Sequence, residues 1–265
     1  MKYKIDHDFH IHSYLSLCSD DPKQNPETIL EYAERNHLSK LCLTDHFWDE
    51  KIPGASDWYK PQNLLHIKRS LPLPQSNNVH FYFGAEAEMD KFFNIGIAEE
   101  TFDEFDFVII PTTHLHMSGF TLEDGVSSED VRAQLWFDRL AALLQMPLPW
   151  KKIGIAHLTC PLIGGADRKA HVRILERLNE DSLRVLFRRA ATVGAGIELN
   201  FNSFMYEGGE LDIILNVYRI AKEEGCKFYL GSDAHHPVGL EKAFDNFSNI
   251  VELLKLDEND KFIFN

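Results

Sequence analysis

Two histidines lie one residue apart near the start of the chain, in DFHIHS at residues 8–13. On an extended strand the side chains at positions i and i+2 point the same way, so His10 and His12 would stand together on one face. Two adjacent imidazoles can bind a metal ion, yet such pairs also occur on ordinary half-exposed strands. One pair does not decide between these interpretations, and the rest of the sequence has to be consulted.

Further histidines and carboxylates recur in short motifs, each close to the end of an apolar segment. They are Asp45 and His46 in LTDH, Glu86 and Glu88 in GAEAE, His114 and His116 in TTHLH, His157 in IAH, Glu198 in IELN, and Asp233, His235 and His236 in GSDAHH. Imidazoles and carboxylates without thiols suit Zn, Mn or Fe. Because the candidates outnumber the ligands of one ion, the sequence predicts a cluster of two or three divalent metal ions. Ions about 3.5–4 Å apart in such clusters promote hydrolysis of phosphate esters.

The segments that carry these motifs have the composition and length of short β-strands. Strands are expected at 3–9, 40–44, 79–86, 105–111, 152–157, 196–200 and 227–232, and helices at 25–36, 61–71, 127–145, 171–194 (one or two helices), 210–225 and 240–255. This alternation predicts a parallel α/β sheet, either open and doubly wound or closed into a barrel. No glycine-rich phosphate loop follows any strand, which disfavours the nucleotide-binding open sheets. In a barrel the strand ends would converge on one face.

Length, charge and cysteine spacing narrow the class of protein. The 265 residues contain no linker or repeat, so we expect a single domain over residues 1–265. The formal net charge of −14 disfavours a polyanion such as nucleic acid as partner. Four scattered cysteines give no disulfide framework. The N-terminus lacks a signal-like apolar core and no apolar run could span a bilayer, so we expect a soluble, cytoplasmic protein without a membrane partner.

Taken in order, the motifs DFHIHS, LTDHF, GAEAE, TTHLH, IAHL and GSDAHHP resemble the PHP (polymerase and histidinol phosphatase) superfamily. The resemblance extends from Asp8 to about Pro237. It implies a distorted (β/α)7 barrel, similar to a TIM barrel. It also implies two or three divalent ions at the C-terminal ends of the strands.

The resemblance also implies a ligand set, carried over motif by motif. One ion would be held by His10, His12, Glu86 and Asp233, and a second by Glu86 with His114 and His157. A third would use His46, His235 and a residue of the loop after the first strand, where many relatives have a histidine and others an aspartate. This loop, SYLSLCSDDPKQNPETI, contains no histidine. Counting back from Ile29 points to Asp20 as the ligand, with Asp21 as its rival.

The reaction implied by the resemblance is phosphoester hydrolysis by a metal-bound hydroxide, and the sequence does not identify a general acid. Asp8 and Asp45 would orient the ligand histidines from outside the metal sites. Arg168, in a glycine-rich basic loop, either binds a substrate phosphate or is a solvated loop cation. Glu88 and His116 are alternatively solvent-facing partners of Glu86 and His114.

These observations favour a phosphatase for a small phosphorylated substrate, with histidinol phosphate as the first candidate. The alternative is a nuclease or nucleotide phosphoesterase acting on nucleic-acid ends. A third class is a non-catalytic module that has kept the fold, which the near-complete ligand set argues against. The sequence makes no prediction about the oligomeric state.

Overall fold

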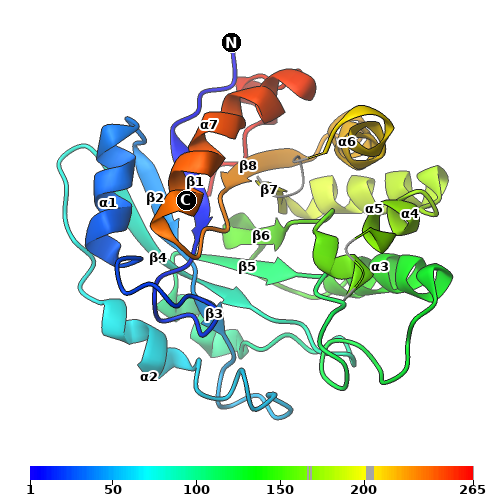
Figure 1. Ribbon diagram of the computed structural model, residues 1–265, viewed down its shortest axis with the longest axis horizontal. Coiled ribbons are helices and arrows are strands. Elements are labelled where there is room, and N and C mark those ends of the chain that lie inside the picture. The colour runs from blue at the N-terminus through cyan, green and yellow to red at the C-terminus, as the bar shows by residue number, and fades with distance from the viewer. Residues whose placement is uncertain (166, 168, 201–205, 265) are drawn as a thin grey trace.

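The computed structural model describes residues 1–165, 167, 169–200 and 206–264. Within these residues, seven parallel strands form a nearly closed barrel (Figure 1). In their order around the barrel they are β1 (His7–Ile11), β2 (Lys40–Leu43), β4 (His80–Ala87), β5 (Phe107–Pro111), β6 (Ile153–Ala156), β7 (Gly196–Asn200) and β8 (Lys227–Gly231). A two-residue strand, β3 (His46–Phe47), pairs with the end of β4. The predicted distorted (β/α)7 barrel is therefore confirmed.

Helices cover the outside of the barrel (Figure 1). They are α1 (Pro26–Arg35), α2 (Leu64–Ile67), α3 (Glu129–Leu143), α4 (Ala170–Leu175), α5 (Glu180–Val193), α6 (Gly208–Glu223) and α7 (Pro237–Leu253). Their ends follow local chemistry: the Asn25 side chain accepts a hydrogen bond from the Thr28 amide and Pro26 occupies the first turn of α1. None of the helices in the described part of the chain is long and apolar enough to cross a membrane.

Two predicted elements differ in extent from the sequence prediction, the two-residue strand β3 was not predicted, and the prediction of one or two helices at 171–194 is resolved as two. The first strand begins at His7 rather than residue 3. The preceding residues turn toward the C-terminal segment, where the backbone of Lys2 forms an isolated antiparallel β-bridge with Asp257. The segment 171–194 forms two helices, with Asn179 capping the second through the Ser182 amide. The helix expected at 61–71 is a single α-helical turn followed by a 3-10 turn at Lys68–Ser70.

Aromatic side chains fill the N-terminal half of the barrel interior. Phe9, Phe107 and Tyr229 come from three strands, and Phe262 and Phe264 come from the C-terminal segment. The Phe107 and Phe264 rings are stacked with their centroids 4.7 Å apart. This aromatic cluster excludes water from one end of the barrel, so a water-accessible polar site can form only at the other end.

A seam between β1 and β8 closes the barrel without a regular ladder. The Asp233 amide donates to the His10 carbonyl (2.7 Å) and the His12 amide donates to the Ala234 carbonyl (3.1 Å). Deeper in the barrel, the His7 imidazole accepts from the Leu230 amide (3.0 Å). The seam therefore aligns the ends of the first and last strands, which both carry predicted ligands.

Asp6, beside this seam, allows a test of how the C-terminal segment is anchored. Burial alone would raise the pKa of Asp6, but hydrogen bonds and charges from His7 and Lys261 lower it to about 2. A carboxyl with a lowered pKa stabilises the folded state above its unfolded pKa, and this contribution is lost as the pH falls toward the folded pKa. The window for this loss is therefore about pH 4 to about pH 2.

We expect Asp6→Asn to lower the free energy of unfolding at neutral pH by about 1 kcal/mol, a value reduced for solvent screening. In metal-free protein, urea unfolding between pH 7 and pH 2 should show a loss of stability in wild type that the variant lacks. Parallel pH profiles for the two proteins would contradict the assignment.

Candidate metal centre

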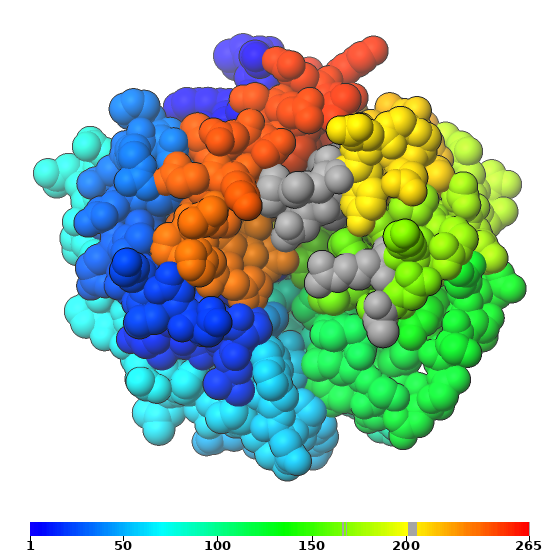
Figure 2. Space-filling view, in the orientation of Figure 1, coloured from blue at the N-terminus to red at the C-terminus, as the bar shows by residue number. Residues whose placement is uncertain are grey.

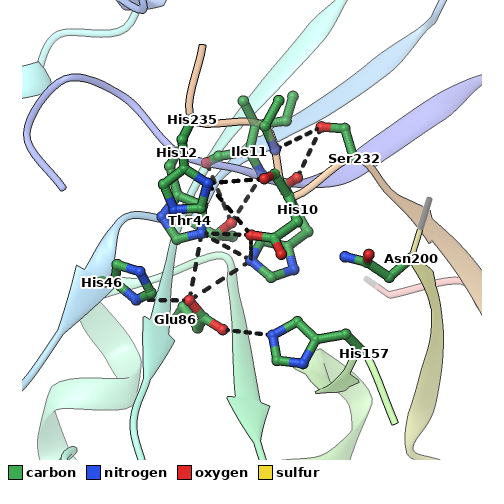
Figure 3. A network of polar contacts seen from close by, with 12 residues as sticks. His10, Ile11, His12, Thr44, His46, Glu86, His157, Asn200, Ser232 and His235 are labelled. Atoms are coloured by element: carbon green, nitrogen blue, oxygen red, sulfur yellow. Dashed lines mark hydrogen bonds and ion pairs between the residues drawn. The ribbon is translucent and has the colours of Figure 1, made fainter. Parts of the chain in front are cut away.

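Four side chains from three strand ends form a compact group in the barrel mouth. His10 and His12 belong to β1 and its end, Glu86 to β4, and Asp233 to the turn after β8. His10 Nε2 lies 3.0 Å from His12 Nε2, 3.7 Å from Glu86 Oε2 and 3.3 Å from Asp233 Oδ1. His12 Nε2 lies 3.4 Å from Glu86 Oε2 and 3.2 Å from Asp233 Oδ1. Figure 3 shows His10, His12 and Glu86 converging.

These separations fit a metal ion better than they fit direct hydrogen bonding. Four ligand atoms placed tetrahedrally at about 2.0–2.1 Å from an ion lie about 3.3 Å from one another, and the five distances scatter around that value. Glu86 Oε2 is buried and makes no regular hydrogen bond in the described residues, although His46 Nδ1 approaches it to 2.8 Å. A buried carboxylate oxygen in that state is costly unless a cation faces it. The first predicted ligand set therefore fits a divalent ion.

The second group shares Glu86 through its other oxygen. Glu86 Oε1 lies 3.2 Å from His157 Nε2 and 4.0 Å from His114 Nε2, and the two imidazole rings are stacked 4.7 Å apart. One carboxylate thus presents Oε2 to the first group and Oε1 to the second. This is the arrangement of a carboxylate that bridges two ions.

A third group contains His12, His46 and His235, whose ring nitrogens lie within 4.8 Å of one another. The His12 and His235 rings are stacked with centroids 4.1 Å apart, and His46 Nδ1 lies 2.8 Å from Glu86 Oε2. His12 and Glu86 therefore connect the third group to the first, so that the three groups form one continuous cluster.

The structure does not bring the predicted loop ligand to this third group. Asp20 is exposed, and Asp21 forms an ion pair with His236 (2.9 Å) at the start of α7. The thiol of Cys18 lies there instead, within hydrogen-bonding reach of His235 and His46. Burial alone would raise the pKa of Cys18, but these two imidazoles lower it to about 7. Arg168, the candidate for binding a substrate phosphate, lies outside the described residues.

Hydrogen bonds at Nδ1 orient most of the histidines. His10 Nδ1 lies 2.9 Å from Glu198 Oε1, and His114 Nδ1 lies 2.7 Å from Glu88 Oε2. His12 Nδ1 faces Ser16 Oγ (3.0 Å), His157 Nδ1 faces Thr113 Oγ1 (3.1 Å), and His235 Nδ1 faces the Asp233 carbonyl (2.9 Å). With the proton on Nδ1, the lone pair of Nε2 points into the cluster, as metal coordination requires.

The orienting carboxylates differ from those expected. Glu88 is fully buried and accepts a hydrogen bond that holds His114, whereas the sequence left it as a solvent-facing alternative. Glu198 holds His10 and also accepts from the His157 amide. The sequence could have indicated the role of Glu88, because it lies two residues after Glu86 and side chains at this spacing share one strand face.

The two aspartates predicted for this orienting role act through other groups. Asp8 accepts hydrogen bonds from the amides of Ser232 (2.9 Å) and His10 (3.4 Å), and burial raises its pKa to about 7 despite them. It therefore holds the backbone of the β1–β8 seam. Asp45 accepts from Ser16 Oγ (2.7 Å), and that hydroxyl faces His12 Nδ1, so Asp45 reaches a ligand through one serine.

Charge and backbone conformation are both adapted to cation binding. Burial alone would raise the pKa of Glu86 and Asp233, but the facing imidazoles, His10 foremost for Asp233 and His46 for Glu86, lower both well below their usual range. Asp233 and His157 have positive φ angles of 52° and 23°. Non-glycine residues adopt this conformation at a cost, which is commonly met at functional sites.

A cavity of about 640 Å³ opens above the cluster. Its lining combines ligand candidates with aromatic and apolar side chains: Cys18, His46, Trp58, Tyr59, His114, His116, Met117, Leu162, Asp233 and His235. Burial, followed by the charge of His114, lowers the pKa of His116 to about 4, which keeps this ring neutral near pH 7. Figure 2 shows the surface indented where the blue and cyan N-terminal third meets the green segments.

Comparisons with known proteins agree with this picture at the level of the fold. No protein-family model and no curated protein matches the chain. Among solved structures, histidinol phosphate phosphatase from Lactococcus lactis, complexed with zinc, L-histidinol and phosphate, is similar over 97% of this chain and 98% of its own, with 16% identity and a TM-score of 0.62. The chain shares the fold of this phosphatase. The shared fold and the three ligand groups agree with the resemblance read from the sequence.

Two more distant structures complete the comparison. A protein of archaeal ribonuclease P with mature tRNA is 13% identical, with 93% of this chain and 91% of that chain covered and a TM-score of 0.39. Metal-dependent tyrosine phosphatases from Bacillus subtilis and Streptococcus pneumoniae are 15% identical, with 97% and 96% covered and a TM-score of 0.38. TM-scores below 0.5 do not support a conclusion about the site.

The Glu88–His114 pair provides a test of the second group. Glu88→Gln keeps the size of the side chain but removes the charge that holds the His114 proton on Nδ1. We expect the affinity for the weakest-bound divalent ion to fall about 10–100-fold, as measured by competition with a chromophoric chelator. Glu100→Gln, at an exposed carboxylate paired with Lys51, is the matched control. Equal affinities in the two variants would show that Glu88 does not support a ligand.

Proposed function

We propose that the chain is a metal-dependent phosphoesterase that hydrolyses a small phosphomonoester, with histidinol phosphate as the first candidate. The observation that carries this proposal is the buried cluster in which Glu86 presents one oxygen to His10 and His12 and the other to His157. Divalent ions bound there would supply a water of lowered pKa and neutralise charge on a phosphoryl group. The side chains hold these ions, and Glu88, Glu198 and Ser16 keep the imidazole protons on Nδ1.

The cavity supports a small substrate rather than a polymer. Its volume of about 640 Å³ lies within the roughly 300–1,000 Å³ typical of small-molecule sites. Trp58, Tyr59, Met117 and Leu162 provide an apolar and aromatic wall beside the ligand candidates. Such a wall can pack against a flat ring such as imidazole while the phosphate faces the metal groups. The net charge of −14 disfavours a nucleic-acid strand outside the pocket.

Removing single ligands tests the metal assignment. His12→Ala or Asp233→Ala should lower phosphate release by more than about 100-fold, the upper cost of losing a group that only supports a ligand. Circular dichroism should show an intact barrel in both variants. His80→Ala, at an exposed histidine on the first residue of β4, is the control and should retain wild-type turnover. Full activity of His12→Ala would show that the first ligand set is wrong.

The substrate class is tested by offering two phosphoesters in parallel. The protein loaded with Mn²⁺ or Zn²⁺ is incubated with histidinol phosphate and, separately, with a short single-stranded oligonucleotide. We expect inorganic phosphate from histidinol phosphate alone, and chelation with EDTA should abolish its release. Stepwise shortening of the oligonucleotide would favour the nuclease alternative. Metal-loaded protein that hydrolyses neither ester nor a generic aryl phosphate would indicate the non-catalytic class.

A further inference from the structure

The loop between β1 and α1 is held in a fixed position on both sides of Cys18. Ser16 Oγ donates to Asp45 (2.7 Å), and the Leu17 amide donates to the side chain of Gln62 (3.0 Å). On the other side, Ser19 Oγ donates to the backbone carbonyl of His235 (2.7 Å). The residues flanking Cys18 are thus tied to the cluster itself, so the position of the thiol is set by the site.

The thiol faces the third ligand group, whereas the carboxylates of the same loop do not. Cys18 lines the cavity together with His46 and His235 and lies within hydrogen-bonding reach of both imidazoles. Asp20 is exposed to solvent, and Asp21 is paired with His236. Within the described part of the loop, Cys18 is therefore the residue that offers a donor atom to this group.

The imidazoles on either side have free donor atoms for a shared ion. His235 Nδ1 is directed at the Asp233 carbonyl (2.9 Å), which leaves the lone pair of Nε2 available. His46 Nδ1 lies 2.8 Å from Glu86 Oε2, which leaves Nε2 of His46 as its second nitrogen for an ion. The ring nitrogens of His12, His46 and His235 lie within 4.8 Å of one another, which is a second indication, independent of the cysteine, that a cation belongs here.

We propose that Cys18 is the loop ligand of the third metal site, which it forms with His46 and His235, and that this site selects Zn²⁺ over Mn²⁺ and Mg²⁺. A thiolate is a soft donor that suits Zn²⁺, whereas Mn²⁺ and Mg²⁺ favour carboxylate, carbonyl and water oxygens. The carboxylate ligand expected from the sequence would have left that choice open. This inference rests on one part of the proposed function, namely that divalent ions bind at this end of the barrel. It does not require phosphoester hydrolysis.

Cobalt serves as the spectroscopic probe of a bound thiolate. Wild-type protein reconstituted with Co²⁺ should show a near-ultraviolet thiolate-to-cobalt charge-transfer band, and Cys18→Ser should lack this band and bind one ion fewer per chain. Cys226→Ala, at a buried cysteine whose thiol faces the Phe187 carbonyl, is the control and should keep the band. A band that persists in Cys18→Ser, or is absent from fully loaded wild type, would overturn the proposal.

Thiol chemistry gives a second readout that needs no turnover. Cys42, Cys160 and Cys226 are buried and Cys18 is exposed, so a thiol reagent applied to native metal-free protein should modify Cys18 first. Zn²⁺ should slow that reaction several-fold, and Mn²⁺ at the same concentration should not. Equal protection by both ions, or by neither, would contradict the proposed selectivity.

The Cys18→Asp variant separates the ligand assignment from the metal preference. It places at position 18 the carboxylate that the sequence predicts as loop ligand. We expect this variant to lose the cobalt band and to bind Mn²⁺ more tightly, relative to Zn²⁺, than wild type does. An unchanged Zn²⁺-to-Mn²⁺ affinity ratio would count against selection by the thiolate. A wild-type protein that shows the band but hydrolyses no phosphoester would refute the proposed function and leave Cys18 as a ligand. Fully loaded protein that releases phosphate but lacks the band would refute Cys18 as a ligand and leave the proposed function supported.

Discussion

The carboxylate of Glu86 is the group on which the rest of the site depends. Its side chain is about 1% exposed, and its two oxygens face imidazoles on both sides, at 2.8 Å from His46 and 3.2 Å from His157. An ionised carboxylate this deep is stable only if positive charge surrounds it. In the metal-free cluster part of that charge comes from protons. Burial alone would lower the pKa of His10 and His46, but the facing carboxylates, Glu198 foremost for His10 and Glu86 for His46, raise the pKa of both imidazoles well above its usual range. Imidazoles that bind metal ions are neutral, with their lone pairs turned inward, and would not provide that charge by themselves. The arrangement is complete only with cations between the donors.

The barrel makes this concentration of polar groups possible by separating its two ends. Aromatic side chains, among them Phe107 and Phe264, close the N-terminal end, and the candidate metal ligands gather at the other. The β1–β8 seam then fixes the distance between the first and the last ligands. The Asp233 amide bonds to the carbonyl of His10, which places a ligand on one strand directly beside a ligand on the other. The backbone thus sets the geometry that the side chains use.

The sequence predicted those parts of the site that depend on regular geometry. Ligands at strand ends, such as His10, Glu86 and His157, could be inferred because parallel strands present their C-terminal ends to one face. Cys18 could not, because its position depends on hydrogen bonds to Asp45, Gln62 and the His235 carbonyl, and no count along the chain reveals them. The two-residue strand β3 was missed for a similar reason. His46 and Phe47 are extended because β4 pairs with them, and their own sequence has no strand period.

The positive charge of the proposed metal ions would allow an acidic protein to bind the proposed anionic substrate. The net charge of −14 creates a field that repels phosphate esters at a distance. In the proposed metal-loaded cluster the balance would be reversed, because Glu86, Asp233 and a Cys18 thiolate would supply fewer charges than two or three divalent ions carry. The imidazoles add no charge in their neutral form and therefore do not offset the ions. The proposed small phosphomonoester would meet this positive region at short range inside the cavity, whereas a polyanion would first have to lie along the acidic surface. The same charge distribution therefore favours substrates small enough to fit entirely inside the pocket.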